Sequence, residues 1–178
     1  MKNVRTSLTD PLRIDWIAAG TGGRIGLTFC PGKNGGSIHG SPWKRDLDLD
    51  LQVIQKSASL LVTLMEEDEL ASHGVEDLGE KAECMGLTWL HLPIRDMSVP
   101  DEAFMEIWPE KSRYLRSFLE KDKNAVIHCL GGLGRTGVVA VMLLADMGIP
   151  AAEALELVRA ARPGTVENRE QEEFCLSY

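Results

Sequence analysis

A glycine-rich loop between a strand-like run and a helix-like run is the feature that constrains this chain most. Residues 124–137 read Asn-Ala-Val-Ile-His-Cys-Leu-Gly-Gly-Leu-Gly-Arg-Thr-Gly, so five residues separate Cys129 from Arg135, and three of the five are glycine. The apolar residues 125–127 favour a strand, and the apolar run 138–144 favours a buried helix. This order predicts a tight loop that carries a cysteine at the end of a sheet.

The loop has the residue types of an anion site with a nucleophile at its centre. Glycine reaches positive φ without a steric penalty, and successive amides in a tight curl form a nest that binds anions. The positive end of the following helix acts on the same point, and the planar fork of Arg135 suits two phosphate oxygens. Such surroundings favour the thiolate of Cys129 and a phosphoryl-cysteine intermediate, with the hydroxyl of Thr136 donating to the departing sulfur. The predicted phosphate-binding residues are Leu130, Gly131, Gly132, Leu133, Gly134 and Arg135.

The same segment fits parts of three other interpretations. Residues 132–137 form the G-x-G-x-x-G pattern of dinucleotide-binding loops, but the helix-like segment 151–161 follows where that fold needs a second strand with an acidic end. A nucleotide P-loop is excluded, because Val138 follows Gly137 where that motif has Lys and then Ser or Thr. A plain turn around a buried cysteine stays open, although it gives no reason for an arginine six positions later.

The stretch His128-Cys129-x5-Arg135-Thr136 resembles the H-C-x5-R-[S/T] signature of the cysteine-dependent protein tyrosine and dual-specificity phosphatases. The loop is similar to that of the kinase-associated (cyclin-dependent kinase inhibitor 3-like) phosphatase subfamily, and the resemblance covers most of residues 12–176. It implies a protein phosphatase that needs no cofactor, with a phosphorylated protein, a kinase among the candidates, as its partner. It also implies that His128 orients the loop and helps to keep the thiol ionised.

This chemistry needs a general acid, because the leaving oxygen departs poorly without a proton. Asp96 is the predicted acid: it lies in a proline-bounded loop after the expected strand 87–92, where the resemblance also places this residue. The same carboxylate would then act as base on the hydrolytic water. Asp101 is the alternative, although its position before an apolar helical run fits a helix N-cap better. A solvated carboxylate without a catalytic role stays open for Asp96.

Composition and charge narrow the class of protein further. With 178 residues and 44% apolar content, the chain predicts one catalytic domain, residues 12–178, preceded by a flexible arm, residues 1–11. A net charge of −8 argues against nucleic acid as a partner. We expect no membrane insertion and no signal peptide, since no long apolar run is present. No metal-ligand spacing occurs either, and a reactive thiol fits a reducing cytoplasm.

Strand-like and helix-like segments alternate along the chain, which predicts an α/β domain with a mostly parallel central sheet and helices on both faces. The expected strands are 14–18, 24–29, 59–64, 87–92 and 125–128, with a glycine turn at 20–23 and a Gly/Ser loop at 33–42. The expected helices are 46–56, 66–72, 75–85, 102–120, 136–147, 151–161 and 169–176. Ligands of such sheets bind beyond the carboxyl ends of the strands, where the Cys129 loop lies.

Substrate choice is less constrained by the residues. Leu130 and Leu133 stand where phosphoinositide-directed relatives carry lysines, which disfavours an inositol lipid, and the lack of a Lys-Asn-Arg-Tyr element implies a shallow pocket of dual specificity. A phosphomonoesterase acting on a non-protein substrate stays open. Two other cysteine enzymes are disfavoured: the loop of a rhodanese-like sulfurtransferase lacks the Arg-Thr ending found here, and an arsenate reductase needs resolving cysteines near the nucleophile, where this chain has none. A module that only binds phosphate is disfavoured because it has no need of the thiol.

Two further segments carry local expectations. The acidic run 66–69 reads as a solvated helix start. Residues 162–168, followed by Gln171, resemble the region that supports the signature loop in related enzymes. We expect Gln171 itself to be an exposed helical residue, with a water-positioning role as the alternative.

Overall fold

The apolar runs of the sequence form one five-stranded sheet with the strand order β1-β2-β7-β5-β6. The computed structural model describes residues 4–18, 20, 22–36 and 40–178. Only β1 is antiparallel, to β2, and the other neighbours are parallel. The predicted mostly parallel sheet is therefore confirmed. The strands are β1 Asp15–Ala18, β2 Arg24–Phe29, β5 Leu60–Thr63, β6 Thr88–His91 and β7 Ala125–Cys129.

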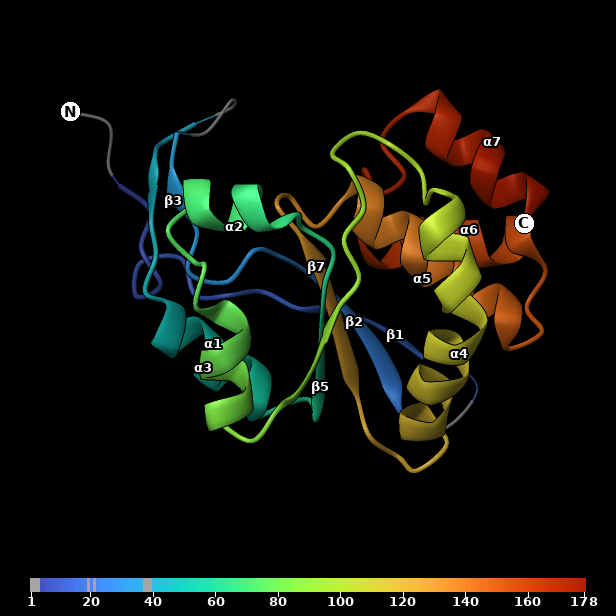
Figure 1. Cartoon of the computed structure of the whole chain (residues 1–178), viewed down its shortest axis with the longest axis horizontal. Helices are drawn as coiled ribbons and strands as arrows, with labels where there is room; N and C mark the ends of the chain where they lie inside the picture. The colour runs from blue at the N-terminus through green and yellow to red at the C-terminus, as the bar shows by residue number, and fades with distance from the viewer. Residues whose placement is uncertain (1–3, 19, 21, 37–39) are drawn as a thin grey trace.

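Helices cover both faces of this sheet, as the alternating pattern predicted (Figure 1). Successive side chains of a strand point to opposite faces, so Leu61 packs with one helical layer while Leu60 and Val62 pack with the other. The first layer consists of α1 Leu47–Gln55, α2 Glu67–Ser72 and α3 Leu78–Cys84. The second consists of α4 Glu102–Leu119, α5 Gly134–Asp146, α6 Ala151–Ala161 and α7 Arg169–Ser177.

Helix α5 is the centre of the second layer, and its sequence explains why. Residues 134–144 are all buried, as expected for a helix that is apolar nearly all round. Helix α4 begins where the sequence predicts a cap: the Asp101 carboxylate accepts a hydrogen bond from Phe104 N at 2.8 Å. Of the helices in the described ranges, none has both the length and the apolar content needed to cross a bilayer.

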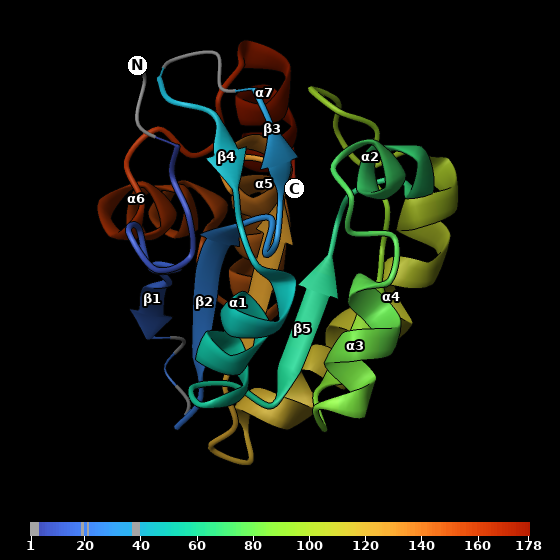
Figure 2. The same cartoon turned by 90° about the vertical axis from the view of Figure 1, so that its left-hand side faces the viewer.

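A two-stranded ribbon, β3 Asn34–Gly35 and β4 Trp43–Lys44, stands beyond the carboxyl end of the sheet (Figure 2). Strand β3 lies inside the segment 33–42 that was expected as a Gly/Ser loop, and β4 directly follows that segment. Residues 37–39 of the expected loop and residue 21 of the glycine turn lie outside the described residues. The N-terminal segment lies beside the ribbon, since Arg5 forms a bridge with Trp43. The division of the chain at residue 11 stays a prediction.

The carboxyl end of the sheet gathers segments that are distant in sequence (Figure 1). Strand β7 ends there between β2 and β5, and α2, the loop before α4, the start of α5 and α7 lie around that end. Any side chain carried by these segments can therefore meet the loop that follows β7.

A buried ion pair fixes the segment between β2 and α1. The Arg45 guanidinium donates to both Asp50 oxygens at 2.7 and 2.8 Å, and both side chains are almost completely buried. Asp50 also accepts from Gly32 N at 2.9 Å. The pair therefore links α1 to the turn after β2 and to the β3–β4 ribbon.

Replacement of Asp50 by alanine should destabilise the protein by about 3–5 kcal/mol, because it leaves the buried charge of Arg45 without a partner. Urea unfolding followed by circular dichroism measures this loss. Asp48→Ala is the matched control on the same helix: Asp48 is 55% exposed and pairs with Lys81 at 3.2 Å, so about 1 kcal/mol or less is expected. Equal losses in the two variants would contradict the structural role of the buried pair.

Candidate active site

The thiol of Cys129 lies at the carboxyl end of β7, as the glycine-loop pattern predicted. Its register partner on β2 is Phe29, and only 3% of the residue is exposed. The sulfur accepts a hydrogen bond from Gly132 N at 3.2 Å. The loop therefore turns back over the thiol and points one of its amides at it.

The main-chain carbonyls of the loop are bound from outside. Arg162 donates to Gly132 O at 2.6 Å and to Gly131 O at 3.0 Å, and Lys33 Nζ donates to Leu130 O at 3.1 Å. Because the carbonyl and the following N–H of a trans peptide point in opposite directions, these contacts turn the N–H groups toward the thiol. This arrangement agrees with the predicted nest, and the binding of an anion by it stays a prediction.

Arg162 is itself held in place by a second ion pair. Its Nη1 lies 2.7 Å from Asp15 Oδ2, and both side chains are mostly buried. The region 162–168 thus supports the loop, in agreement with the expectation for this segment. The sequence offered no signal that a residue of β1 takes part, because Asp15 and Arg162 lie 147 positions apart.

Gly134, at the start of α5, shows how tightly the loop is surrounded. Its N–H donates to Glu167 Oε2 at 2.6 Å, so a carboxylate occupies one amide at the positive end of the helix. Glu167 is exposed and lines the cavity above Cys129. An incoming phosphate group that uses this amide must displace the Glu167 carboxylate.

The guanidinium of Arg135 points into the same site and is only 2% exposed. It makes a two-point contact with the Glu69 carboxylate at 2.6 and 2.9 Å and donates to Ile94 O at 3.0 Å. Burial lowers the pKa of Arg135, but the hydrogen bond to Glu69 and the neighbouring negative charges outweigh it, so the pKa is raised. Arg135 is therefore a permanent, oriented cation beside the thiol.

Glu69 corrects the expectation for the acidic run 66–69. That run was expected to be a solvated helix start, but the Glu69 side chain is only 17% exposed and binds Arg135. Burial raises the pKa of Glu69, while the contacts with Arg135 and with the amide of Glu66 lower it further than burial raises it. A weak signal existed in the sequence: α2 directly follows β5, at the sheet edge where the loop lies.

Asp96 reaches the site from the loop before α4. Its Oδ1 lies 2.8 Å from Arg135 Nη2, and the side chain is 58% exposed at the rim of the cavity. Asp101, the alternative, caps α4 instead. The position of Asp96 agrees with the role of general acid, which stays a prediction.

Helix α7 holds the loop that carries Asp96. Asn168 Nδ2 donates to Met97 O at 2.9 Å, and Gln171 Nε2 donates to Ser98 O at 3.2 Å. Gln171 is completely buried, so its expected exposure is wrong. The physical reason is tertiary: the amide of Gln171 bridges this loop and the N–H of Glu167, which no helical periodicity reveals.

His128 and Thr136 flank the loop at the end of β7 and at the start of α5. His128 Nε2 lies 2.8 Å from Thr63 Oγ1 and Nδ1 lies 3.4 Å from the carbonyl of Cys129, so its contacts orient the main chain and do not reach the sulfur. Burial lowers the pKa of His128 to about 3, which keeps the ring neutral. The buried hydroxyl of Thr136 has no hydrogen-bond partner among the described residues, so its expected donation to the sulfur stays a prediction.

Cys129, Arg135 and Asp96 line one cavity of about 510 Å³. This volume is typical of sites for small ligands or single side chains. Glu69 and Arg162 are not among its lining residues, but they bind residues that are: Glu69 binds Arg135, and Arg162 binds the carbonyl of Gly131. The predicted residues that line the cavity are Asp96, Cys129, Leu130, Gly131, Leu133 and Arg135. Residues that sequence analysis missed also line it: Arg5, Lys33, Asn34, Trp43, His73, Met97 and Glu167.

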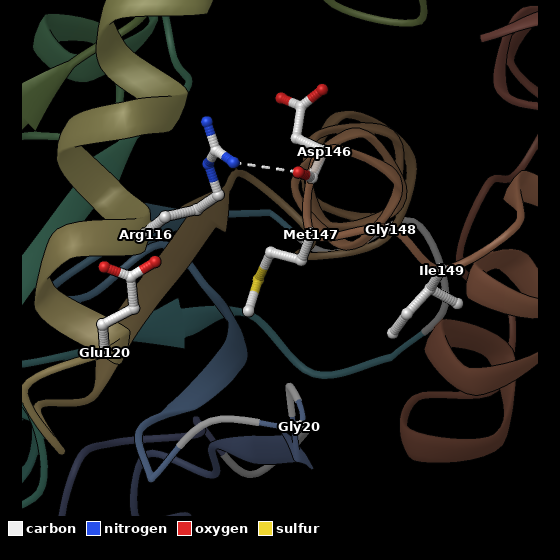
Figure 3. Close-up of a pocket in the computed structure, with 7 residues that line it drawn as sticks. All are labelled: Gly20, Arg116, Glu120, Asp146, Met147, Gly148 and Ile149. Atoms are coloured by element: carbon white, nitrogen blue, oxygen red, sulfur yellow. Dashed lines mark hydrogen bonds between the residues drawn. The ribbon is translucent and has the colours of Figure 1, made fainter.

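A second cavity, of about 350 Å³, lies at the other end of α5 (Figure 3). Arg116 and Glu120 extend from α4 on one side, and Met147 and Ile149 follow α5 on the other. Arg116 donates to Asp146 O at 3.0 Å. None of the described residues that line this second cavity is a cysteine or a histidine, so they supply no nucleophile like that of the first. Within the described ranges, no three His, Cys, Asp or Glu side chains are grouped to hold a metal ion.

Known proteins resemble this chain in sequence and in fold. Residues 40–149 match the family model described as "Polymorphic toxin system, DSP-PTPase phosphatase". PRL-1 phosphatase of Drosophila melanogaster is 28% identical over 101 residues, which are 56% of this chain and 55% of that protein. Cyclin-dependent kinase inhibitor 3 of Rattus norvegicus is 26% identical over 176 residues, which are 94% of this chain and 79% of that protein.

A crystal structure of kinase associated phosphatase, with its catalytic-site cysteine replaced by serine, has a TM-score of 0.81 with this structure. The two chains are 24% identical, and the match covers 93% of this chain and 92% of the other. At that identity the likeness shows the fold. The matches to four curated relatives, PRL-1 phosphatase among them, span only 53 to 61% of those proteins.

The geometry of the loop predicts a large effect of alanine at one glycine and almost none at its neighbour. Gly132 has φ +70°, and a Cβ there would overlap the main chain of Thr28, whereas a Cβ on Gly131 meets nothing within 4 Å. Gly132→Ala should therefore weaken the binding of inorganic phosphate about tenfold or more, since such strain costs about 1–3 kcal/mol. Isothermal titration calorimetry with phosphate measures this change. Gly131→Ala is the control and should bind within about twofold of the parent; equal behaviour of both variants would argue against the nest.

Proposed function

The chain belongs to the DSP-PTPase phosphatase family of polymorphic toxin systems, and on that premise we propose that it hydrolyses phosphate esters of protein side chains through a phosphocysteine intermediate. The observation that carries the proposal is the convergence of three groups on one cavity. These are the thiol of Cys129, which accepts a hydrogen bond from the amide of Gly132, the guanidinium of Arg135 and the carboxylate of Asp96.

In the first step the thiolate of Cys129 attacks the phosphorus atom of the substrate. The S–P bond forms while the bond from phosphorus to the leaving oxygen breaks, and Asp96 transfers its proton to that oxygen. The loop amides and Arg135 bind the equatorial oxygens, where charge is spread in the transition state. The substrate phosphate takes over the amide of Gly134, which Glu167 occupies in this structure.

In the second step water attacks the phosphorus atom of the phosphocysteine. The carboxylate of Asp96 takes a proton from the water as the S–P bond breaks, so that inorganic phosphate leaves and the thiolate is restored. The hydroxyl of Thr136, which is buried below the loop, donates to the sulfur as it departs. Over the two steps Asp96 gives up one proton and takes one back, and no change of oxidation state occurs.

The substrate is proposed to be a phosphorylated protein. Leu130 and Leu133 give the loop an apolar surface, which suits a peptide better than an inositol ring crowded with phosphates. Two similar proteins carry the names cyclin-dependent kinase inhibitor 3 and kinase associated phosphatase, so a phosphorylated kinase is among the candidate partners. We propose activity toward phosphotyrosine, phosphoserine and phosphothreonine, in the reducing environment of the cytoplasm.

Replacement of Cys129 by serine should abolish turnover and preserve binding, because the hydroxyl is not a nucleophile at neutral pH while the ring of amides is unchanged. Release of p-nitrophenol from p-nitrophenyl phosphate measures turnover, and calorimetry with a phosphotyrosine peptide measures binding. The same variant, immobilised, captures the physiological substrate from a lysate. Retained turnover in Cys129→Ser would contradict the proposed nucleophile.

Replacement of Asp96 by alanine should lower kcat by about 10²–10⁴, the usual contribution of a general acid. Asp101→Asn is the control, since asparagine keeps the helix cap and removes only the charge. The pair is compared with p-nitrophenyl phosphate and with a phosphoserine peptide, whose leaving group needs the proton more. A normal rate for Asp96→Ala together with a slow Asp101→Asn would reassign the acid to Asp101.

A further inference from the structure

The cavity above Cys129 extends beyond the signature loop to a wall built by other segments. Lys33, Asn34 and Trp43 come from the β3–β4 ribbon and the turn before it, and Arg5 comes from the N-terminal segment beside it. None of these residues belongs to the sequence signature. Two of the four are basic, in a chain whose net charge is −8.

Lys33 is an unusual residue in this wall, because only 9% of it is exposed. Its Nζ donates to Leu130 O at 3.1 Å and lies 4.7 and 4.8 Å from the ring centroids of Phe29 and Trp43. No carboxylate lies within ion-pair distance of Nζ among the described residues. Burial is the main reason that the pKa of Lys33 is lowered, to about 8.

A buried cation without an anionic partner is unfavourable. The two rings and the single carbonyl offset only part of that cost. An anionic group of a ligand, placed beside Nζ, would supply the missing partner. Charged side chains that are retained in such surroundings within a cleft are candidates for binding.

The two neighbouring arginines make different contacts, and Arg5 donates to Ser41 O at 3.1 and 3.3 Å. Arg45 lies near the same rings, but both of its bonding edges are engaged by Asp50 and the Asp10 carbonyl. The guanidinium of Arg5 stacks on Trp43 at 3.6 Å from the ring centroid and lines the cavity. Arg5 and Lys33 therefore place two basic side chains along one wall of the cavity.

The other side of the cavity carries the opposite charge. Asp96 and Glu167 line it there, on the loop before α4 and on the segment before α7. A substrate whose phosphate lies over Cys129 meets these carboxylates on one side and Lys33 with Arg5 on the other. A second anionic group is therefore attracted to the ribbon side and repelled from the α7 side.

We propose that Lys33, with Arg5 and the ring of Trp43 beside it, forms a subsite for a second anionic group next to the phosphate that Cys129 attacks. The substrate class that fits is a phosphopeptide in which an acidic or a phosphorylated residue flanks the phosphorylated residue. This inference rests on the proposed function and adds the substrate preference of the same site.

Three phosphotyrosine peptides test the subsite with the unmodified enzyme. They share one sequence and differ only at the residue that flanks phosphotyrosine, which is glutamine, glutamate or phosphothreonine. Since a hydrogen bond to a charged group is worth more than a neutral one, kcat/KM should be about tenfold higher for at least one anionic peptide than for the glutamine peptide. The comparison of glutamate with phosphothreonine identifies which anion the subsite takes.

A pair of lysine variants then assigns the preference to Lys33. In Lys33→Met the ratio of kcat/KM between the anionic and the glutamine peptides should fall to within about twofold. Lys44→Met is the matched control, because Lys44 belongs to the same ribbon but is exposed and does not line the cavity; it should keep the parent ratio. The ratio is the readout because Lys33 also supports the loop through Leu130, so that its loss can lower all rates together.

The outcomes separate this inference from the proposed function. An enzyme that hydrolyses p-nitrophenyl phosphate and all three peptides equally well has the proposed activity without the subsite, and the inference is then wrong. An enzyme that hydrolyses none of these compounds lacks the proposed function itself. A preference that survives in Lys33→Met and disappears in Lys44→Met overturns the assignment to Lys33, whatever the stability of either variant.

Discussion

The site depends on one constraint, which is that the carbonyl groups of the loop after β7 are held outward. Arg162 binds the carbonyls of Gly131 and Gly132, and Lys33 binds that of Leu130. A planar peptide that directs its oxygen outward must direct its N–H inward, so these contacts create the nest around Cys129. Arg162 and Lys33 therefore set the direction of the loop amides from outside the loop. The binding of a phosphate by these amides stays a prediction.

The charged side chains at the site are also held in place by contacts with other residues. Arg135 is buried and remains charged because Glu69 binds both of its terminal nitrogens, while Asp96 contacts it at the rim. A buried charge is tolerated when it is paired and hydrogen-bonded, and pairing also fixes its orientation for a ligand. Lys33 departs from this pattern, and that departure is why a ligand group is expected beside it.

Local patterns in the sequence predicted most of the elements and the centre of the site. The strand β2 and the helix α6 have the predicted bounds, the cap at Asp101 is present, and the cysteine loop lies at the carboxyl end of a parallel strand. Each of these depends on neighbours within a few positions in the chain. The errors concern Glu69 and Gln171, which were expected at the surface. Glu69 is partly buried and Gln171 is completely buried, each through contacts with segments far away in sequence.

By itself, the sequence determined that a thiol and an arginine would share a tight glycine loop at the end of a sheet, because glycine, hydrophobic period and spacing act locally. Only the tertiary structure decided which residues complete the site: Glu69 beside Arg135, Asp15 behind Arg162, and Lys33 with Trp43 along one wall. The physical reason is that parallel strands end at one edge, so the loops that follow them meet there. Which side chains pair at that edge depends on strand order and register, which local pattern does not encode.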